Sequence, residues 1–175
     1  FNSLPISEHR DVSLVVMSVL MFIGGSPGST AGGIKTTTFA IILGVLLMVI
    51  RNKKEVVCFN RRIPDSLVFR ALTITIFSLI LIVLVTCSLM FTESYHSEIF
   101  AERGKFLTLL YETVSAFGTV GLSTGITPHL SSAGKLLITF MMYVGRVGPL
   151  TMAIIFASLD APLNISHPDG KMMIG

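Results

Sequence analysis

The tripeptide Thr119-Val120-Gly121 has a composition that suits the binding of a dehydrated potassium ion by backbone carbonyls. Potassium leaves water only where other oxygens replace its hydration shell, and extended segments can supply rings of carbonyls. Glycine permits the backbone angles that turn successive carbonyls to one side. The short apolar segment 107–117 comes first and, as a helix, would point its partially negative C-terminus at the ion. We therefore predict a pore helix and filter over 106–125; an ordinary tight turn is the alternative.

Three charged residues stand in otherwise apolar sequence, where charge is costly and indicates a functional site by default. Arg146 below a filter would repel cations, so we predict that it belongs to a gate; a purely structural role, capping loop carbonyls or pairing with an acid, is the alternative. For Lys35 the alternative to function is snorkelling toward the cytoplasm. We expect Glu112 to support the pore helix by binding backbone N–H groups behind the filter, because an unpaired carboxylate there is costly. Attraction of cations is its other possible role.

The segment 24–33 is rich in glycine and contains Pro27, so no continuous helix should survive it. We predict helices over 11–24 and 34–51, joined by a loop that lies in protein or in a watery cavity. The loop is similar to a nucleotide-binding P-loop, but Ile34 stands where that pattern requires glycine before lysine, so we exclude this function. A loop of so little bulk can change its arrangement at modest cost, and below a filter it would act as a gate.

The composition indicates an integral membrane protein. Of the 175 residues, 51% are hydrophobic and only 13% are charged, whereas soluble domains carry about 25% charged residues. The two cysteines form no disulfide framework, and the four histidines lack the spacing of metal ligands. Most secreted and nucleic-acid-binding classes are excluded, and we expect no bound cofactor and no enzymatic activity.

The order of apolar and charged segments predicts an all-α topology. The basic segment 52–64 should be a cytoplasmic linker, because loops rich in Lys and Arg lie on the cytoplasmic side of membrane proteins. An outer helix over 65–92 then crosses the membrane, and a polar loop follows on the outer side. The pore loop 106–125 enters the membrane again from that side, and an inner helix over 132–158 returns to the cytoplasm. The tail 160–175 should be cytoplasmic. Residues 1–51 would end one repeat with a broken inner helix, and 65–159 would form the next repeat.

The two parts of the chain show a possible internal repeat at an offset of 121 residues, which pairs the segments 21–24 and 142–145. Chance similarity between apolar helices is the alternative. Two other functions stay open. A secondary transporter for a small solute would need the broken helix, with coupling ions bound at the break, but no pore helix with a filter. A non-conducting scaffold would need neither.

The sequence resembles the Ktr/Trk/HKT potassium transporter superfamily, and its bacterial Ktr branch most closely. The segment 24–36 is similar to the intramembrane gating loop of the third repeat, the segment 115–123 to the filter of the fourth repeat, and Gly145-Arg146 to part of the final inner helix. The resemblance implies that the carbonyls of four residues bind K⁺: Thr119, Val120, Gly121 and Leu122. It further implies a gate made of Arg146 and nine loop residues: Gly25, Ser26, Pro27, Gly28, Ser29, Thr30, Ala31, Gly32 and Gly33.

The resemblance also implies an architecture and partners. The family has four repeats of outer helix, pore loop and inner helix around one pore, so this chain would carry the end of the third repeat and the whole fourth. Its membrane subunit forms a homodimer on a cytoplasmic ring of nucleotide-binding regulatory subunits. We expect K⁺, alone or together with Na⁺, as the transported ion. We further expect membrane lipids but no nucleic acid as partners, and a multi-pass protein of the bacterial inner membrane.

Overall fold

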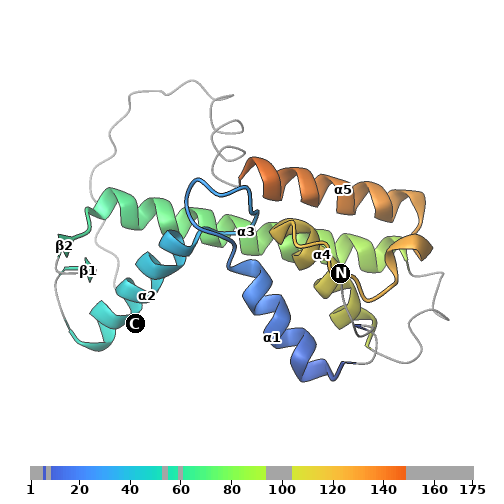
Figure 1. The fold of residues 1–175 in the computed structure, drawn as a ribbon, viewed down its shortest axis with the longest axis horizontal. Helices are drawn as coiled ribbons and strands as arrows, with labels where there is room; N and C mark the ends of the chain where they lie inside the picture. The colour runs from blue at the N-terminus through green and yellow to red at the C-terminus, as the bar shows by residue number, and fades with distance from the viewer. Residues whose placement is uncertain (1–5, 7–8, 53–54, 59–60, 94–103, 149–175) are drawn as a thin grey trace, which may run out of the picture.

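A computed structural model describes residues 6, 9–52, 55–58, 61–93 and 104–148. Five α-helices account for most of them, and Figure 1 shows their arrangement. In chain order the elements are α1 Asp11–Phe22, α2 Thr36–Ile50, β1 Val57–Cys58, β2 Arg61–Arg62, α3 Asp65–Thr92, α4 Lys105–Gly118, the short 3₁₀ helix η3 Thr127–His129, and α5 Ser132–Val147. Residues 94–103 of the predicted outer loop 93–105 lie outside the described residues, as does the predicted cytoplasmic tail 160–175.

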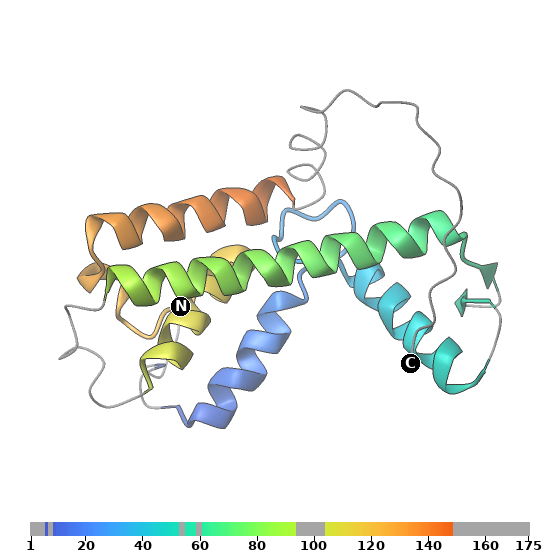
Figure 2. The same ribbon diagram turned by 180° about the vertical axis from the view of Figure 1, so that it is seen from behind.

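Helix α3 runs along the whole length of the structure (Figure 2) and coincides in its bounds with the predicted outer helix. Its 28 residues extend for about 42 Å at 1.5 Å per residue, which exceeds a hydrocarbon core of about 30 Å. No ionisable side chain other than Cys87 occurs from Ala71 to Thr92. Within the described part of the chain, α3 is the one helix both long and apolar enough to cross a membrane.

The break between α1 and α2 is longer than predicted. Helix α1 ends at Phe22 and α2 begins at Thr36, because the two limbs of the intervening loop bond to each other. The N–H of Gly24 donates to the carbonyl of Ile34 at 2.7 Å, and the N–H of Ile34 donates to the carbonyl of Phe22 at 3.1 Å. This short parallel bridge brings the loop ends together, so the chain leaves α1 and enters α2 at nearly one place.

Helix α4 is the centre of the fold and packs against α1, α3 and α5. Its residues from Thr108 through Gly118 are buried with one exception, and Tyr111 and Phe117 are fully buried. The Phe117 ring stacks on Phe22 of α1, with 6.0 Å between the ring centroids. A helix of 14 residues is only about 21 Å long and does not cross a bilayer, so its enclosure by three other helices is what holds it in place.

Two details differ from the sequence predictions. The inner helix predicted over 132–158 ends at Val147, because Gly148 takes a φ of +94° that an α-helix cannot include; positions 149–158 lie outside the described residues. The five helices confirm the all-α class, and the linker adds to them a small antiparallel sheet of two residues per strand, which pairs Val57 with Arg62. Its β-branched valine favours a strand, and a salt bridge of 3.0 Å joins Arg62 to Glu55.

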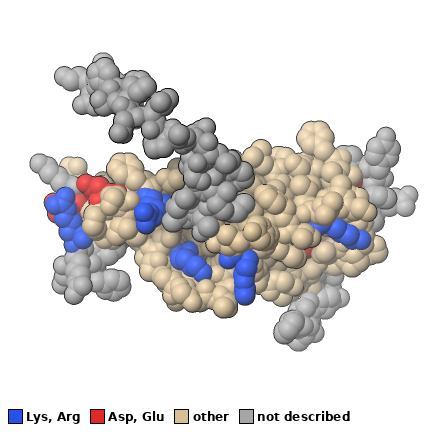
Figure 3. All heavy atoms as spheres, turned by 90° about the horizontal axis from the view of Figure 1, so that it is seen from above, with Lys and Arg blue, Asp and Glu red and all other residues tan. Residues whose placement is uncertain are grey.

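Large apolar side chains are exposed along α2 and α3, and no residue of α2 is buried. Figure 3 shows a surface that is mainly uncharged, with Asp and Glu visible chiefly at one end. Exposed apolar patches of this extent mark contacts with a membrane or with other protein. The helices of this chain therefore have neighbours beyond the chain itself.

Helices α1 and α5 begin at equivalent positions of the suspected repeat. Ser132 follows Asp11 by the same 121 residues that separate the paired segments, and both helices pack against α4. The predicted offset rests on residue similarity and on the shared order of loop, helix and mid-helix glycine. The agreement of the helix starts is a further observation in its favour.

Candidate filter and gate site

The chain turns sharply at the end of α4, where the predicted filter begins. Thr119 caps the helix in the left-handed region at φ +53°, and its N–H donates to the carbonyl of Ala116. The N–H of Val120 donates to the carbonyl of Ser115 at 3.0 Å. Gly121 has φ +83°, but a Cβ there would meet no atom within 4 Å. The turn thus needs glycine at position 121 for its backbone angle and not for space.

The four carbonyls predicted to bind K⁺ are not equivalent. The Ser115 hydroxyl donates to the carbonyl of Leu122 at 2.6 Å, which ties this end of the segment back to α4. The Val120 side chain is 45% exposed. The segment is therefore held to α4 at Leu122, while the side chain of Val120 is exposed.

Glu112 lies behind the segment and is nearly fully buried. Its Oε1 accepts hydrogen bonds from the Ser123 hydroxyl at 2.6 Å and from the Thr124 N–H at 2.8 Å and hydroxyl at 3.0 Å. Its Oε2 accepts from the Thr127 hydroxyl at 2.9 Å. A buried carboxylate is tolerated when several donors satisfy it. In this structure Glu112 joins α4 to the chain that follows the predicted filter.

A cavity of about 490 Å³ opens between the end of α4 and α5. Thr119 and Gly121 line it on one side, Ile138 and Met142 on the other, and Arg146 also borders it. The predicted filter turn and the predicted gate arginine therefore face one space.

The base of the glycine-rich loop is buried and docks on the end of α4. The N–H of Gly32 donates to Oγ1 of Thr119 at 2.8 Å, and the N–H of Gly33 donates to the carbonyl of Phe117 at 3.1 Å. A Cβ on Gly32 would lie 2.7 Å from the Thr119 methyl. On the side of α5, Gly145 touches the Phe117 carbonyl so closely that a Cβ would overlap it. Only glycines allow these three segments to meet.

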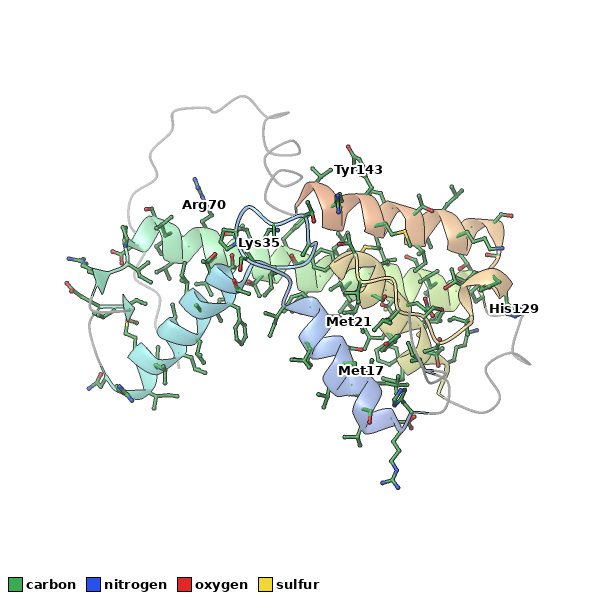
Figure 4. All side chains as sticks on the ribbon, viewed as in Figure 1. Met17, Met21, Lys35, Arg70, His129 and Tyr143 are labelled. Atoms are coloured by element: carbon green, nitrogen blue, oxygen red, sulfur yellow. The ribbon has the colours of Figure 1, made fainter. Side chains whose placement is uncertain are left out.

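The tip of the loop, residues 26–31, is exposed and is held by two cations. Lys35 donates from Nζ to the carbonyls of Ser29 at 3.2 Å and Ala31 at 2.7 Å, and both contacts are exposed. Figure 4 shows Lys35 beside the loop, at the start of α2. Arg146 donates from Nη1 to the carbonyl of Thr30 at 2.8 Å. In the described part of the chain, no carboxylate lies within salt-bridge distance of Arg146.

The remaining predicted gate residues shape the loop. The carbonyl of Gly25 accepts from the N–H of Thr36 at 3.2 Å, which closes the loop where α2 begins. The N–H of Ser29 donates to the carbonyl of Ser26 at 3.0 Å and encloses Pro27 and Gly28 in a tight turn. Gly28 has φ +82°, which favours glycine there.

Sequence reasoning missed a buried polar cluster at the other end of α4. Glu93 is 1% exposed and accepts hydrogen bonds from the N–H and the hydroxyl of Ser131. The Ser131 hydroxyl also accepts from the N–H of Gly134 and so caps α5, and Lys105 donates to the Glu93 carbonyl at 2.6 Å. The only sequence signal was Ser131 directly before an apolar segment, since serine is favoured at the N-cap of a helix.

Residues 1–166 match the family described as TrkH, cation transport protein. The chain is 42% identical over its whole length to the Ktr system potassium uptake protein B of Bacillus subtilis, and covers 37% of that protein. It is 36% identical over its whole length to the protein of the same name from Vibrio alginolyticus, of which it also covers 36%.

A third relative is the potassium/sodium uptake protein NtpJ of Enterococcus hirae, which is 36% identical over 177 residues; the chain covers 38% of it. The chain thus spans little more than a third of the curated relatives it matches. The resemblance drawn from the glycine-rich loop and the Thr-Val-Gly turn is confirmed. With a match over nearly all of its residues, this chain belongs to the TrkH family of cation transport proteins, which are membrane proteins.

Proposed function

We propose that the chain forms the filter and gate of the potassium-translocating subunit of a Ktr/Trk-type uptake system. The observation that carries the proposal is the cavity of about 490 Å³ that both the Thr119–Gly121 turn and Arg146 border, while Arg146 also binds the glycine-rich loop. The carbonyls of residues 119–122 bind K⁺ in this proposal. The loop 25–33 and Arg146 oppose its passage, because an arginine near the path adds an electrostatic barrier to cations.

The relatives support K⁺ as the ion. Two of them are named for potassium uptake, and the Enterococcus relative is named for potassium and sodium. We propose that K⁺ is transported here and that Na⁺ accompanies it in some members of the family. The anchoring of Leu122 to Ser115 leaves Thr119, Val120 and Gly121 as the main ion ligands.

The chain would carry the end of the third repeat and all of the fourth. In this assignment α1 and α2 are one inner helix broken by the loop, α3 is an outer helix, α4 is a pore helix and α5 is an inner helix. The equal offset of the starts of α1 and α5 supports it. The segment 52–64 and the tail 160–175 face the cytoplasm of a bacterium, where a regulatory ring that binds nucleotides would meet a homodimer of the complete subunit.

The test is ion uptake by the complete subunit in liposomes. Gly121→Ser places a Cβ on a backbone angle that suits glycine, so we expect a weaker preference for K⁺ over Na⁺. Gly125→Ser is the matched control, since Gly125 has φ +95° with equally open surroundings but lies outside residues 119–122. Unchanged selectivity in Gly121→Ser would contradict the filter. Uptake of a small organic solute without K⁺ selectivity would favour a secondary transporter, for which the cavity is large enough.

A further inference from the structure

Thr119 combines two features that a filter residue bound only to ions would not need. It is β-branched and yet takes φ +53°, a conformation that is an outlier for such a residue and persists only where its surroundings enforce it. Its hydroxyl is turned to the glycine-rich loop and accepts the N–H of Gly32, a residue 87 positions earlier in the chain. Strain of this kind tends to occur at functional sites.

Gly32 and Thr119 pack tightly against each other. Gly32 is buried, and a Cβ on it would meet the Thr119 methyl at 2.7 Å, the Phe117 carbonyl at 2.8 Å and the Thr119 hydroxyl at 2.8 Å. The hydrogen bond of Gly33 to Phe117 lies beside it. The loop therefore cannot leave the end of α4 without releasing the Thr119 side chain.

We infer that Thr119 is a positioning residue that couples the loop to the filter: its hydroxyl binds Gly32 instead of the ion, and thereby fixes the carbonyls that follow it. This inference rests on the proposed function and extends it. Because the side chain of Thr119 holds the loop while its backbone N–H caps the pore helix, displacement of the loop changes the filter geometry. Selectivity for K⁺ then depends on the position of the gate.

Two classes of variant separate this role from direct ion binding. Thr119→Val keeps the β-branched shape but removes the hydrogen-bond acceptor, whereas Thr119→Ser keeps the acceptor. Thr113→Val is the matched control, because Thr113 is buried in the same helix and its hydroxyl bonds only within that helix, to the carbonyl of Leu109 at 2.8 Å. Each change is also made in a complete subunit whose loop 25–33 is replaced by a short linker without the Gly32 donor.

The measurement is the ratio of K⁺ to Na⁺ uptake in liposomes, normalised to folded protein. Loss of one hydrogen bond should lower the preference for K⁺ roughly three- to tenfold in Thr119→Val. Thr119→Ser and Thr113→Val should resemble the parent. In the subunit whose loop is replaced, the preference for K⁺ over Na⁺ should already be lower than in the parent. Thr119→Val should lower it no further there. Thr119→Ala, which also lacks the acceptor, serves if the valine variant fails to fold.

Other outcomes overturn the inference in distinguishable ways. An equal loss of selectivity from Thr119→Val with and without the loop would show that the hydroxyl acts on the ion itself. Unchanged selectivity in both hydroxyl-free variants would show that the contact has no role in transport. Absence of K⁺ uptake by the parent and by Thr113→Val would instead refute the proposed function and the inference together.

Discussion

Arg146 donates a hydrogen bond from Nη1 to the carbonyl of Thr30 at 2.8 Å, and so joins α5 to the tip of a loop that lies 116 residues earlier. The bond is accompanied by those of Lys35 to the carbonyls of Ser29 and Ala31. Three successive carbonyls are thus held by two cations from different helices. Hydrogen bonds with a charged donor contribute more to stability than neutral ones do, about 1.5–3 kcal/mol each.

The first prediction concerns this arginine. Arg146→Ala removes both the hydrogen bond to the loop and the positive charge beside the cavity, so we expect K⁺ flux to rise roughly tenfold or more, given the bond energy above. Arg146→Lys keeps the charge and should give an intermediate flux. Arg70→Ala is the control, because Arg70 projects away from α3 in Figure 4 and should leave flux unchanged. A flux in Arg146→Ala at or below that of the parent would contradict the gate role.

The second prediction concerns Glu112. In Glu112→Gln one carboxylate oxygen becomes an amide donor that faces hydroxyl and N–H donors, so thermal stability in detergent should fall, by about 2 kcal/mol in unfolding free energy. Glu55→Gln is the control, since Glu55 is about half exposed and its salt bridge to Arg62 contributes little. Equal stability of the two variants would show that Glu112 does not support the filter segment.

The third prediction concerns the contact between α5 and α4. Gly145→Ala adds a Cβ that would overlap the backbone carbonyl of Phe117, which cannot move without disturbing the end of α4. We expect a destabilisation of roughly 1–3 kcal/mol, the usual cost of overpacking. Gly104→Ala, whose Cβ would meet no atom within 4 Å, should be nearly neutral. Measured melting temperatures that agree for both variants would contradict this close contact.

The fourth prediction concerns orientation. Single cysteines replace Arg62 in the linker and His129 before α5, in a protein whose native Cys58 and Cys87 are serine. Positive charge in the linker predicts that it faces the cytoplasm. A membrane-impermeant thiol reagent added outside intact cells should therefore label position 129 and not position 62. The reverse pattern would invert the proposed topology.

Much of the fold follows from the sequence because long apolar runs and glycine-rich breaks are strong local signals. The outer helix 65–92 appears with the predicted bounds, since Asp65 follows Pro64 at its start and most of the remaining residues are apolar. The end of α5 could not be predicted from apolarity alone, because Gly148 and not a change of hydropathy ends it.

The site was only partly predictable for a physical reason. Motif residues such as Gly121 and Arg146 are recognisable by type, but their partners are set by contacts between distant segments. The bond of Lys35 to the loop, the coupling of Thr119 to Gly32 and the burial of Glu93 all depend on tertiary packing. Serine and threonine hydroxyls that bind carbonyls or carboxylates carry no periodic signal in the sequence.

The central claim is that the glycine-rich loop opposes K⁺ flux, and excision of its tip tests it most directly. A Cβ built on Gly25 would lie 2.9 Å from the Cβ of Ala31, so the two limbs are close to each other at the base of the tip, and removal of residues 26–30 joins them there. This deletes the Thr30 carbonyl that Arg146 binds but leaves Gly32 against Thr119. We predict that K⁺ uptake into liposomes rises well above the parent and needs no cytoplasmic regulator. Uptake equal to or below the parent, at equal amounts of folded protein, would show that the loop is a structural break and not a gate.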